Sequence, residues 1–147
     1  MQKQIIDFFP DVAADGIPGL AREVRDLYCI GAVAIGDAIV LDVTDTTHGL
    51  GRSFKESTIV ADSEIFAGIA IEAQSAAGVV KVVTRGQAYA SLETSVAAGA
   101  ALGVHTVDGQ LITAVIGTSH VVACALEAEG AVTAGFGRVC VTYSVCA

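Results

Sequence analysis

FAGIAIEA, at residues Phe66 to Ala73, recurs 55 positions later as VVACALEA, at residues Val121 to Ala128. The two octapeptides share Ala at the fifth place and Glu-Ala at the end, and their larger apolar residues keep the same alternation. Self-similarity at a fixed offset is typical of a duplicated structural unit. Compositional bias in a chain rich in Val and Ala is the alternative interpretation.

Two further blocks extend the match. Upstream, the pattern Val-x-x-Gly-x-Ala of Val33 to Ala38 returns at Val96 to Ala101, and downstream Lys81 to Thr84 corresponds to Arg138 to Val141. The three blocks keep the same order in both halves of the chain. We therefore predict two pseudo-repeated β units, whose bounds are about residues 28–86 and 91–145.

Short runs rich in Val, Ile and Ala alternate with turn signals, which is typical of an all-β barrel or sandwich. In the last run Val139 and Val141 share one face while Arg138 and Cys140 share the other, the period of a half-buried strand. The predicted strands are Ala38 to Val43, Ile65 to Ala73, Val79 to Arg85, Leu111 to Val115, Val121 to Ala128 and Phe136 to Val145.

Two local segments complete the fold prediction. Asp108-Gly109 predicts a tight hairpin with both residues at positive φ. Leu20 to Tyr28 fits one face of a helix, but its counterpart in the second repeat looks extended, so a strand is favoured. We expect a single β domain over residues 20–147, since 147 residues suit one core.

The charge balance restricts the partners. Lys and Arg number 8 against 16 Asp and Glu, a net charge of −8, and no basic run exists to contact nucleic acid or an anionic membrane. The apolar runs are far shorter than the roughly 20 residues that span a bilayer, and residues 1–15 lack the pattern of a secretion signal. We expect a chain made in the cytoplasm that binds neither nucleic acid nor membrane.

Hydrophobic content points to association. Hydrophobic residues make up 53% of the chain, and counting Gly in place of Tyr gives about 62%, against a usual 45–50%. The excess predicts a subunit or partner interface. The four cysteines are too scattered for a disulfide framework.

Two segments stand out as contact elements. Residues 1–19 hold both prolines and predict an extended N-terminal arm, in which Ile5, Ile6, Phe8 and Phe9 form an apolar anchor. Packing of this arm on its own barrel is the alternative. The connection Thr44 to Glu64 contains a long polar loop, in which Thr46, His48 and Arg52 are candidate binding residues.

No catalytic, cofactor or metal site is predicted. His120 and Cys124 would stand about 13 Å apart along a strand, too far for one zinc ion. Gly117 to Val121 lacks the closing Gly of a nucleophile elbow, and Gly49 to Ser53 lacks the rest of a phosphate loop. Glu72 and Glu127 are more simply explained by the duplication than by acid–base catalysis. We expect a protein that is not an enzyme and carries no cofactor.

The layout of these small residues, over about residues 28 to 145, resembles the β-rich capsid cement, or head decoration, proteins of tailed bacteriophages. The segments that carry the resemblance are Gly68 to Ala73, Gly78 to Val83, Arg85-Gly86, Val96 to Gly99, Asp108 to Leu111, Ala125 to Ala128 and Arg138-Val139. The long Thr44 to Glu64 connection and the aromatic-bearing arm depart from the compact members of that group.

The resemblance implies a structural virion protein on the outer surface of an expanded capsid. It would bind the major capsid protein and its own copies as a homotrimer, and stabilise the shell without catalysis. An oligomeric β-module for receptor or host-surface adhesion would share the composition, and is the alternative.

Overall fold

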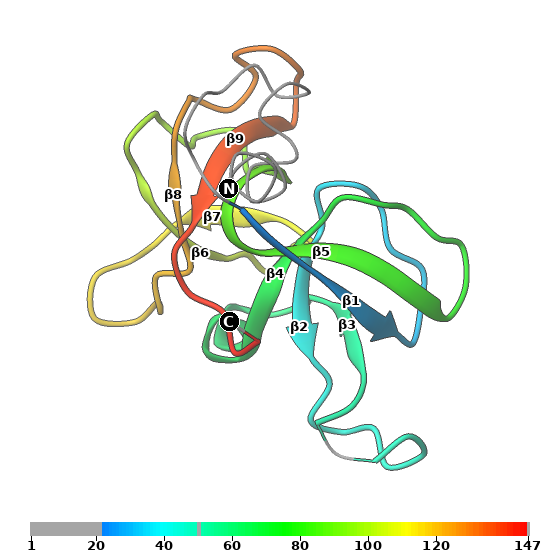
Figure 1. The fold of residues 1–147 in the computed structure, drawn as a ribbon. Coiled ribbons are helices and arrows are strands. Elements are labelled where there is room, and N and C mark those ends of the chain that lie inside the picture. The colour runs from blue at the N-terminus through cyan, green and yellow to red at the C-terminus, as the bar shows by residue number, and fades with distance from the viewer. Residues whose placement is uncertain (1–21, 50, 147) are drawn as a thin grey trace, which may run out of the picture.

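The computed structural model describes residues 22–49 and 51–146. These residues form an all-β fold with one short helix, which confirms the predicted fold class (Figure 1). The strands are β1 (Glu23–Cys29), β2 (Ala38–Leu41), β3 (Phe54–Glu56), β4 (Phe66–Ala70), β5 (Gly78–Ser91), β6 (Ala101–Val104), β7 (Leu111–Thr113), β8 (Ala123–Ala125) and β9 (Phe136–Val141). The 3-10 helix η1 covers Val60–Ile65. Within the described ranges, no helix is both long and apolar enough to cross a membrane.

The first unit is a closed, mixed barrel of five strands. Its order is β1-β3-β2-β4-β5, and β1 returns to pair with β5. β1 and β3 run parallel through the pairing of Cys29 with Phe54, whereas the other neighbours are antiparallel. The segment Leu20 to Tyr28 therefore contributes a strand, as predicted, over its described part.

The second unit begins where the first ends, because β5 continues for six residues beyond the first barrel. Its segment from Gly86 to Ser91 pairs with β9, which is followed by β8, β6 and β7. A parallel bridge from Leu92 to Leu111 brings β7 back to the end of β5. Figure 1 shows β5 as the long strand that runs from one unit into the other.

The strand pairings repeat at the offsets found in the sequence. Ala38 pairs with Ile69 in the first unit, and Ala101 with Cys124 in the second. The same hydrogen bond also recurs: the Gly36 N–H donates to the Ala70 carbonyl at 2.8 Å, and the Gly99 N–H donates to the Ala125 carbonyl at 2.8 Å. The equivalence continues upstream, where β1 and the segment from Gly86 to Leu92 hold corresponding places.

Three local expectations needed correction. Only Gly109 has positive φ in the Asp108-Gly109 turn, because every positive-φ residue among those described is a glycine. The Gln110 N–H donates to the Val107 carbonyl at 3.2 Å, so one positive-φ residue is sufficient for this turn. The predicted strands are also longer than those observed, apart from β5, and the Thr44 to Glu64 connection contains β3 and η1 as well as a loop.

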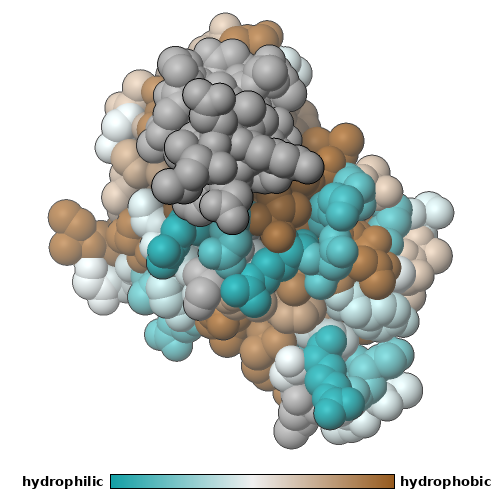
Figure 2. Space-filling model, viewed as in Figure 1, coloured by the Kyte–Doolittle hydropathy of each residue, from teal (hydrophilic) through white to brown (hydrophobic). Residues whose placement is uncertain are grey.

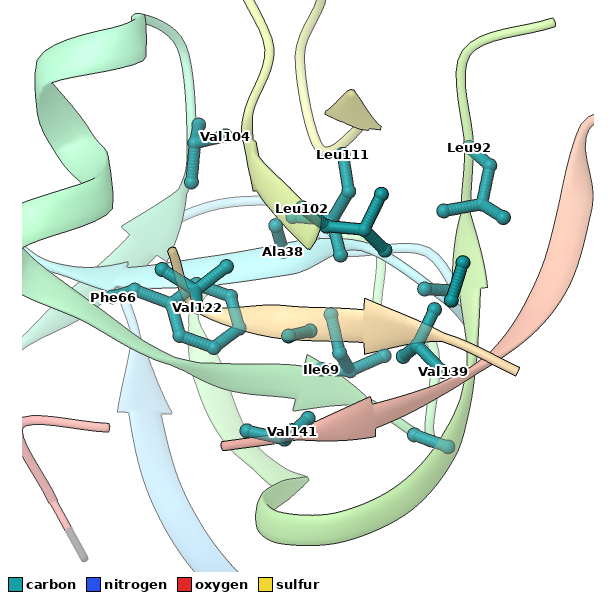
Figure 3. Packing of buried hydrophobic residues seen from close by; sticks show 14 of the residues in the cluster. Ala38, Phe66, Ile69, Leu92, Leu102, Val104, Leu111, Val122, Val139 and Val141 are labelled. Atoms are coloured by element: carbon teal, nitrogen blue, oxygen red, sulfur yellow. The ribbon is translucent and has the colours of Figure 1, made fainter. Parts of the chain in front are cut away.

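Among the described residues, two apolar clusters lie one on each face of the β4–β5 pair. Ala70 and Val82 point into the smaller cluster, inside the first barrel. Ile69 and Val83 point the other way, into a larger cluster shared with the second unit. Figure 3 shows Ile69 and Phe66 from the first unit among side chains of the second, such as Val139. Full burial of each such side chain stabilises the fold by about 1.5–3 kcal/mol, so the shared cluster holds the two units together.

Candidate functional site

The loop of residues 42–53 is the main difference between the two units. It joins β2 to β3 with twelve residues, whereas the equivalent connection from β6 to β7 has only six, residues 105–110. Figure 1 shows it extending away from the barrel at the lower end of the view, far from the start of β9. The duplication therefore leaves one unit with a projecting loop and the other with a short turn.

Asp45 organises this loop through its carboxylate. One oxygen accepts hydrogen bonds from the backbone N–H groups of Thr47 and His48, at 2.9 and 3.3 Å. The other lies 2.7 Å from the His48 ring Nδ1 and accepts a 2.6 Å hydrogen bond from the Ser53 hydroxyl. The Ser53 hydrogen bond, with the His48 and Thr47 contacts, lowers the pKa of Asp45 to about 2. The Asp45 carboxylate thus holds this part of the loop in a defined conformation, since Asp side chains stabilise turns in this way.

The predicted binding residues all lie on the exposed surface of this loop. The side chains of Thr46, His48 and Arg52 face solvent. The His48 ring also packs against the Tyr28 ring of β1, with centroids 5.0 Å apart, which ties the loop to the barrel. The structure therefore brings the three residues onto one loop. The other predicted contacts, Ile5, Ile6, Phe8 and Phe9, lie outside the described residues.

A second surface, which the sequence did not predict, lies at the end of β5 and the start of β9. Ile35, Tyr89, Val132, Thr133 and Phe136 line an open and mainly apolar pocket. Ile35 and Val132, which both line this pocket, are 55% and 68% exposed. The Arg138 guanidinium lies over the Tyr89 ring, 5.8 Å from its centroid. The contributing segments are distant in sequence, so only the fold brings them together.

A third feature is an apolar tip on the loop between β7 and β8. Val115 is 60% exposed and Ile116 is fully exposed. In Figure 2 a hydrophobic group protrudes at the left of the molecule, where Figure 1 places this loop. Exposed apolar side chains that project in this way are typical of contact surfaces.

Two carboxyl groups and a glycine join the two units. The Ala38 N–H donates to the Gly109 carbonyl at 2.8 Å, and the Gly109 N–H donates to the Ser57 carbonyl at 3.0 Å. Asp37, which is 8% exposed, and Glu56 both lie against Gly109, where a Cβ would come within 2.8 Å of their oxygens. The short turn of the second unit is therefore docked on the first.

The carboxyl pair is electrostatically perturbed. Burial raises the pKa of Asp37. Burial and the neighbouring Asp37 carboxylate raise the pKa of Glu56 to about 7, with a smaller contribution from Asp108. Because two adjacent carboxylates repel when both are ionised, the pair holds a proton to near-neutral pH. The second unit has Ala100 and Thr113 at the equivalent positions, so this pair is not a product of the duplication.

The carboxylates of Glu72 and Glu127 and the ring of His120 each have a defined contact. Glu72 accepts a hydrogen bond from the Lys81 N–H at 3.3 Å, and Glu127 accepts the equivalent one from the Arg138 N–H at 2.9 Å. The His120 ring packs against the Tyr143 ring, with centroids 4.3 Å apart. Within the part of the chain that the structure describes, no three His, Cys, Asp or Glu residues are placed to hold a metal ion.

A scan against models of known protein families finds no match to this chain, and a search of curated proteins finds no relative.

Proposed function

We propose that this protein is a structural virion protein that binds the outer surface of a tailed-phage capsid and stabilises the shell, acting as a homotrimer. It would attach to the major capsid protein and to its own copies. Binding only to the assembled, expanded shell lowers that shell's free energy relative to other states, so no catalytic step is required.

The observation that carries this proposal is the asymmetry between two otherwise equivalent units. One unit bears a projecting loop with exposed Thr46, His48 and Arg52, where the other has a short turn that is docked on the first unit through Gly109. The loop extends at the lower end of the view in Figure 1, whereas β9, whose first residue Phe136 lines the apolar pocket, starts near the top. Separate surfaces of this kind suit a protein that must contact both a shell and its sister subunits.

The apolar surfaces support self-association in particular. A cyclic trimer needs a heterologous interface, in which one patch meets a different patch on the next subunit. The pocket near Tyr89 and the tip at Ile116 are two such different apolar patches. Mass measurement of the purified full chain in solution tests this part of the proposal, with a trimer expected and a monomer contradicting it.

The capsid part is tested by mixing the full chain with expanded, undecorated phage shells. We expect electron microscopy to show added density on the outer surface, and we expect the melting temperature of the shell to rise. The triple variant Thr46→Ala, His48→Ala and Arg52→Ala should raise the dissociation constant for the shell at least about tenfold, the loss of roughly 1.4 kcal/mol of binding free energy. The matched control Ser75→Ala with Thr94→Ala, exposed positions outside the loop and outside the apolar patches, should bind shells as wild type does.

Deletion of residues 1–10 tests the arm separately. We expect a folded barrel with sharply weakened attachment to shells, and unchanged occupancy would refute an anchoring role for Ile5, Ile6, Phe8 and Phe9. Failure to bind any expanded shell, together with binding to a glycan array or to host cells, would favour the adhesion module instead.

A further inference from the structure

Two of the four cysteines lie directly opposite each other on neighbouring strands. The register of β8 and β9 pairs Cys124 with Cys140. Both alternate with buried neighbours, Ala125 and Val139, so both thiols lie on the same outer face of the sheet. Each residue is half-buried, and neither is in a disulfide.

The neighbouring hydrogen bonds show which kind of antiparallel pair Cys124 and Cys140 form, and this sets the distance between their Cα atoms. The Thr142 N–H donates to the Val122 carbonyl at 3.0 Å, and the Leu126 N–H donates to the Arg138 carbonyl at 2.8 Å. Hydrogen-bonded pairs alternate along an antiparallel ladder, so Cys124 and Cys140, midway between these two, are also a hydrogen-bonded pair. Their Cα atoms are then about 5.5 Å apart, within the range of about 4.4–6.8 Å found in disulfides.

The other two cysteines have no such arrangement. Cys29 is fully buried, and its burial raises the pKa of the thiol to about 11, which makes it unreactive. Cys146 packs against the smaller cluster, inside the first barrel, whereas Cys124 and Cys140 lie on the second unit. Cys124 is close enough to raise the pKa of Cys140, in addition to the effect of burial.

We infer that Cys124 and Cys140 form a reversible disulfide that joins β8 to β9 when the protein meets an oxidising thiol buffer. The thiolate of one cysteine attacks oxidised glutathione, forms a mixed disulfide and releases one glutathione. The second thiolate then attacks the protein sulfur of that mixed disulfide and releases the other glutathione. Two protein thiols are oxidised, one glutathione disulfide is reduced to two thiols, and the two protons pass to the released glutathiones.

The disulfide would be easily reduced, because the spacing of Cβ atoms across the two strands is wider than a relaxed disulfide requires. Directly opposite residues have Cβ atoms about 4.5–5.5 Å apart, while a relaxed disulfide needs about 3.5–4.5 Å. Closing the bond therefore requires β8, a strand of only three residues, to move slightly toward β9. A bond formed in this way is more easily reduced than a relaxed one.

The place where this disulfide would form rests on the proposed function, although the thiol chemistry itself does not. A virion protein is made in a reducing cytoplasm and is later carried into an oxidising medium. The pair would then stay reduced during assembly and oxidise on the released particle.

The test uses the purified full chain, first reduced and then equilibrated with oxidised glutathione. Free thiols in denaturant should fall from four to two, with no change in oligomeric mass. Trypsin cleaves after Arg85 and Arg138, so it releases Cys124 on peptide 86–138 and Cys140 on peptide 139–147. Without reduction these two peptides should remain linked, and dithiothreitol should separate them.

Two variants assign the bond. The linked peptides should persist in Cys146→Ser, which leaves Cys140 as the only cysteine of the last peptide, and should be absent from Cys140→Ser. The inference is overturned by four free thiols after oxidation, by a glutathione adduct on each cysteine in place of the link, by a link to Cys146, or by a bond between chains. Because none of these measurements involves a shell, they are independent of the proposed function.

Discussion

Replacing Glu56 by Gln removes the one carboxyl group that must ionise near neutral pH beside Asp37. The two side chains share a hydrogen bond against Gly109, where the second unit is docked on the first. Gln keeps the shape and the capacity to donate a hydrogen bond to Asp37, but it never acquires charge. The substitution therefore isolates the electrostatic cost of ionising the pair.

The direction in which stability changes with pH follows from the raised pKa of Glu56. A group whose pKa is higher in the folded state stabilises the fold fully at low pH, and this stabilisation is lost as the pH rises through the folded value. The window runs from the ordinary value of 4.5 to about 7. The difference of about 2.5 pH units corresponds to roughly 3.4 kcal/mol as an upper limit. Glu56 is only half-buried and solvent screens the repulsion, so we expect about 1–2 kcal/mol.

The assay is urea unfolding of wild type and Glu56→Gln at intervals from pH 4.5 to pH 8. We expect the two free energies of unfolding to agree at pH 4.5, and the variant to be more stable by about 1–2 kcal/mol at pH 8. Groups that titrate identically in both proteins cancel in this difference. Glu64→Gln, at an exposed position, should follow wild type throughout. A variant less stable than wild type at pH 8, or with the same pH dependence, would refute the reasoning.

Three further substitutions test other parts of the fold. Gly109→Ala should lower the free energy of unfolding in urea by about 2 kcal/mol or more, because the φ of Gly109 is +71° and the new Cβ meets two carboxylates. An additional Asp37→Ala should recover part of this loss, because it removes one of those carboxylates. Ile69→Ala should cost about 2–5 kcal/mol and keep one thermal transition by calorimetry, since its cluster spans both units, whereas two separate transitions would contradict a shared core. Asp45→Ala should speed tryptic cleavage after Arg52, while Thr46→Ala should not.

The duplication could be predicted because both halves of the chain keep similar residue types at similar spacing. The match of Phe66 to Ala73 with Val121 to Ala128 corresponds to equivalent strands, and their partners keep the same register. Strand ends were predicted less well, because hydrophobic residues continue beyond the last ladder pair into loops such as the one holding Val115. The turn at Asp108 was mispredicted because Asp-Gly suits more than one turn type.

The candidate surfaces were predictable only in part. The loop with His48 and Arg52 was visible as a polar insertion in one repeat. The pocket at Tyr89 and Val132 was not, because it joins segments that only the fold makes adjacent. The raised pKa of Glu56 arises from its burial and from the neighbouring Asp37, which is distant in the sequence, so no local sequence pattern predicts it. The sequence offers one sign of this pair, because Asp37 occupies the position that Ala100 holds in the second repeat.

The continuous strand β5 has a mechanical consequence. Its fourteen residues serve as the last strand of the barrel and the first strand of the second unit, so the two halves meet without any linker. Tension applied to one end of the molecule reaches the other through covalent backbone, and each half resists it with a ladder of hydrogen bonds loaded along the strand. A pull along this strand is therefore shared by both ladders.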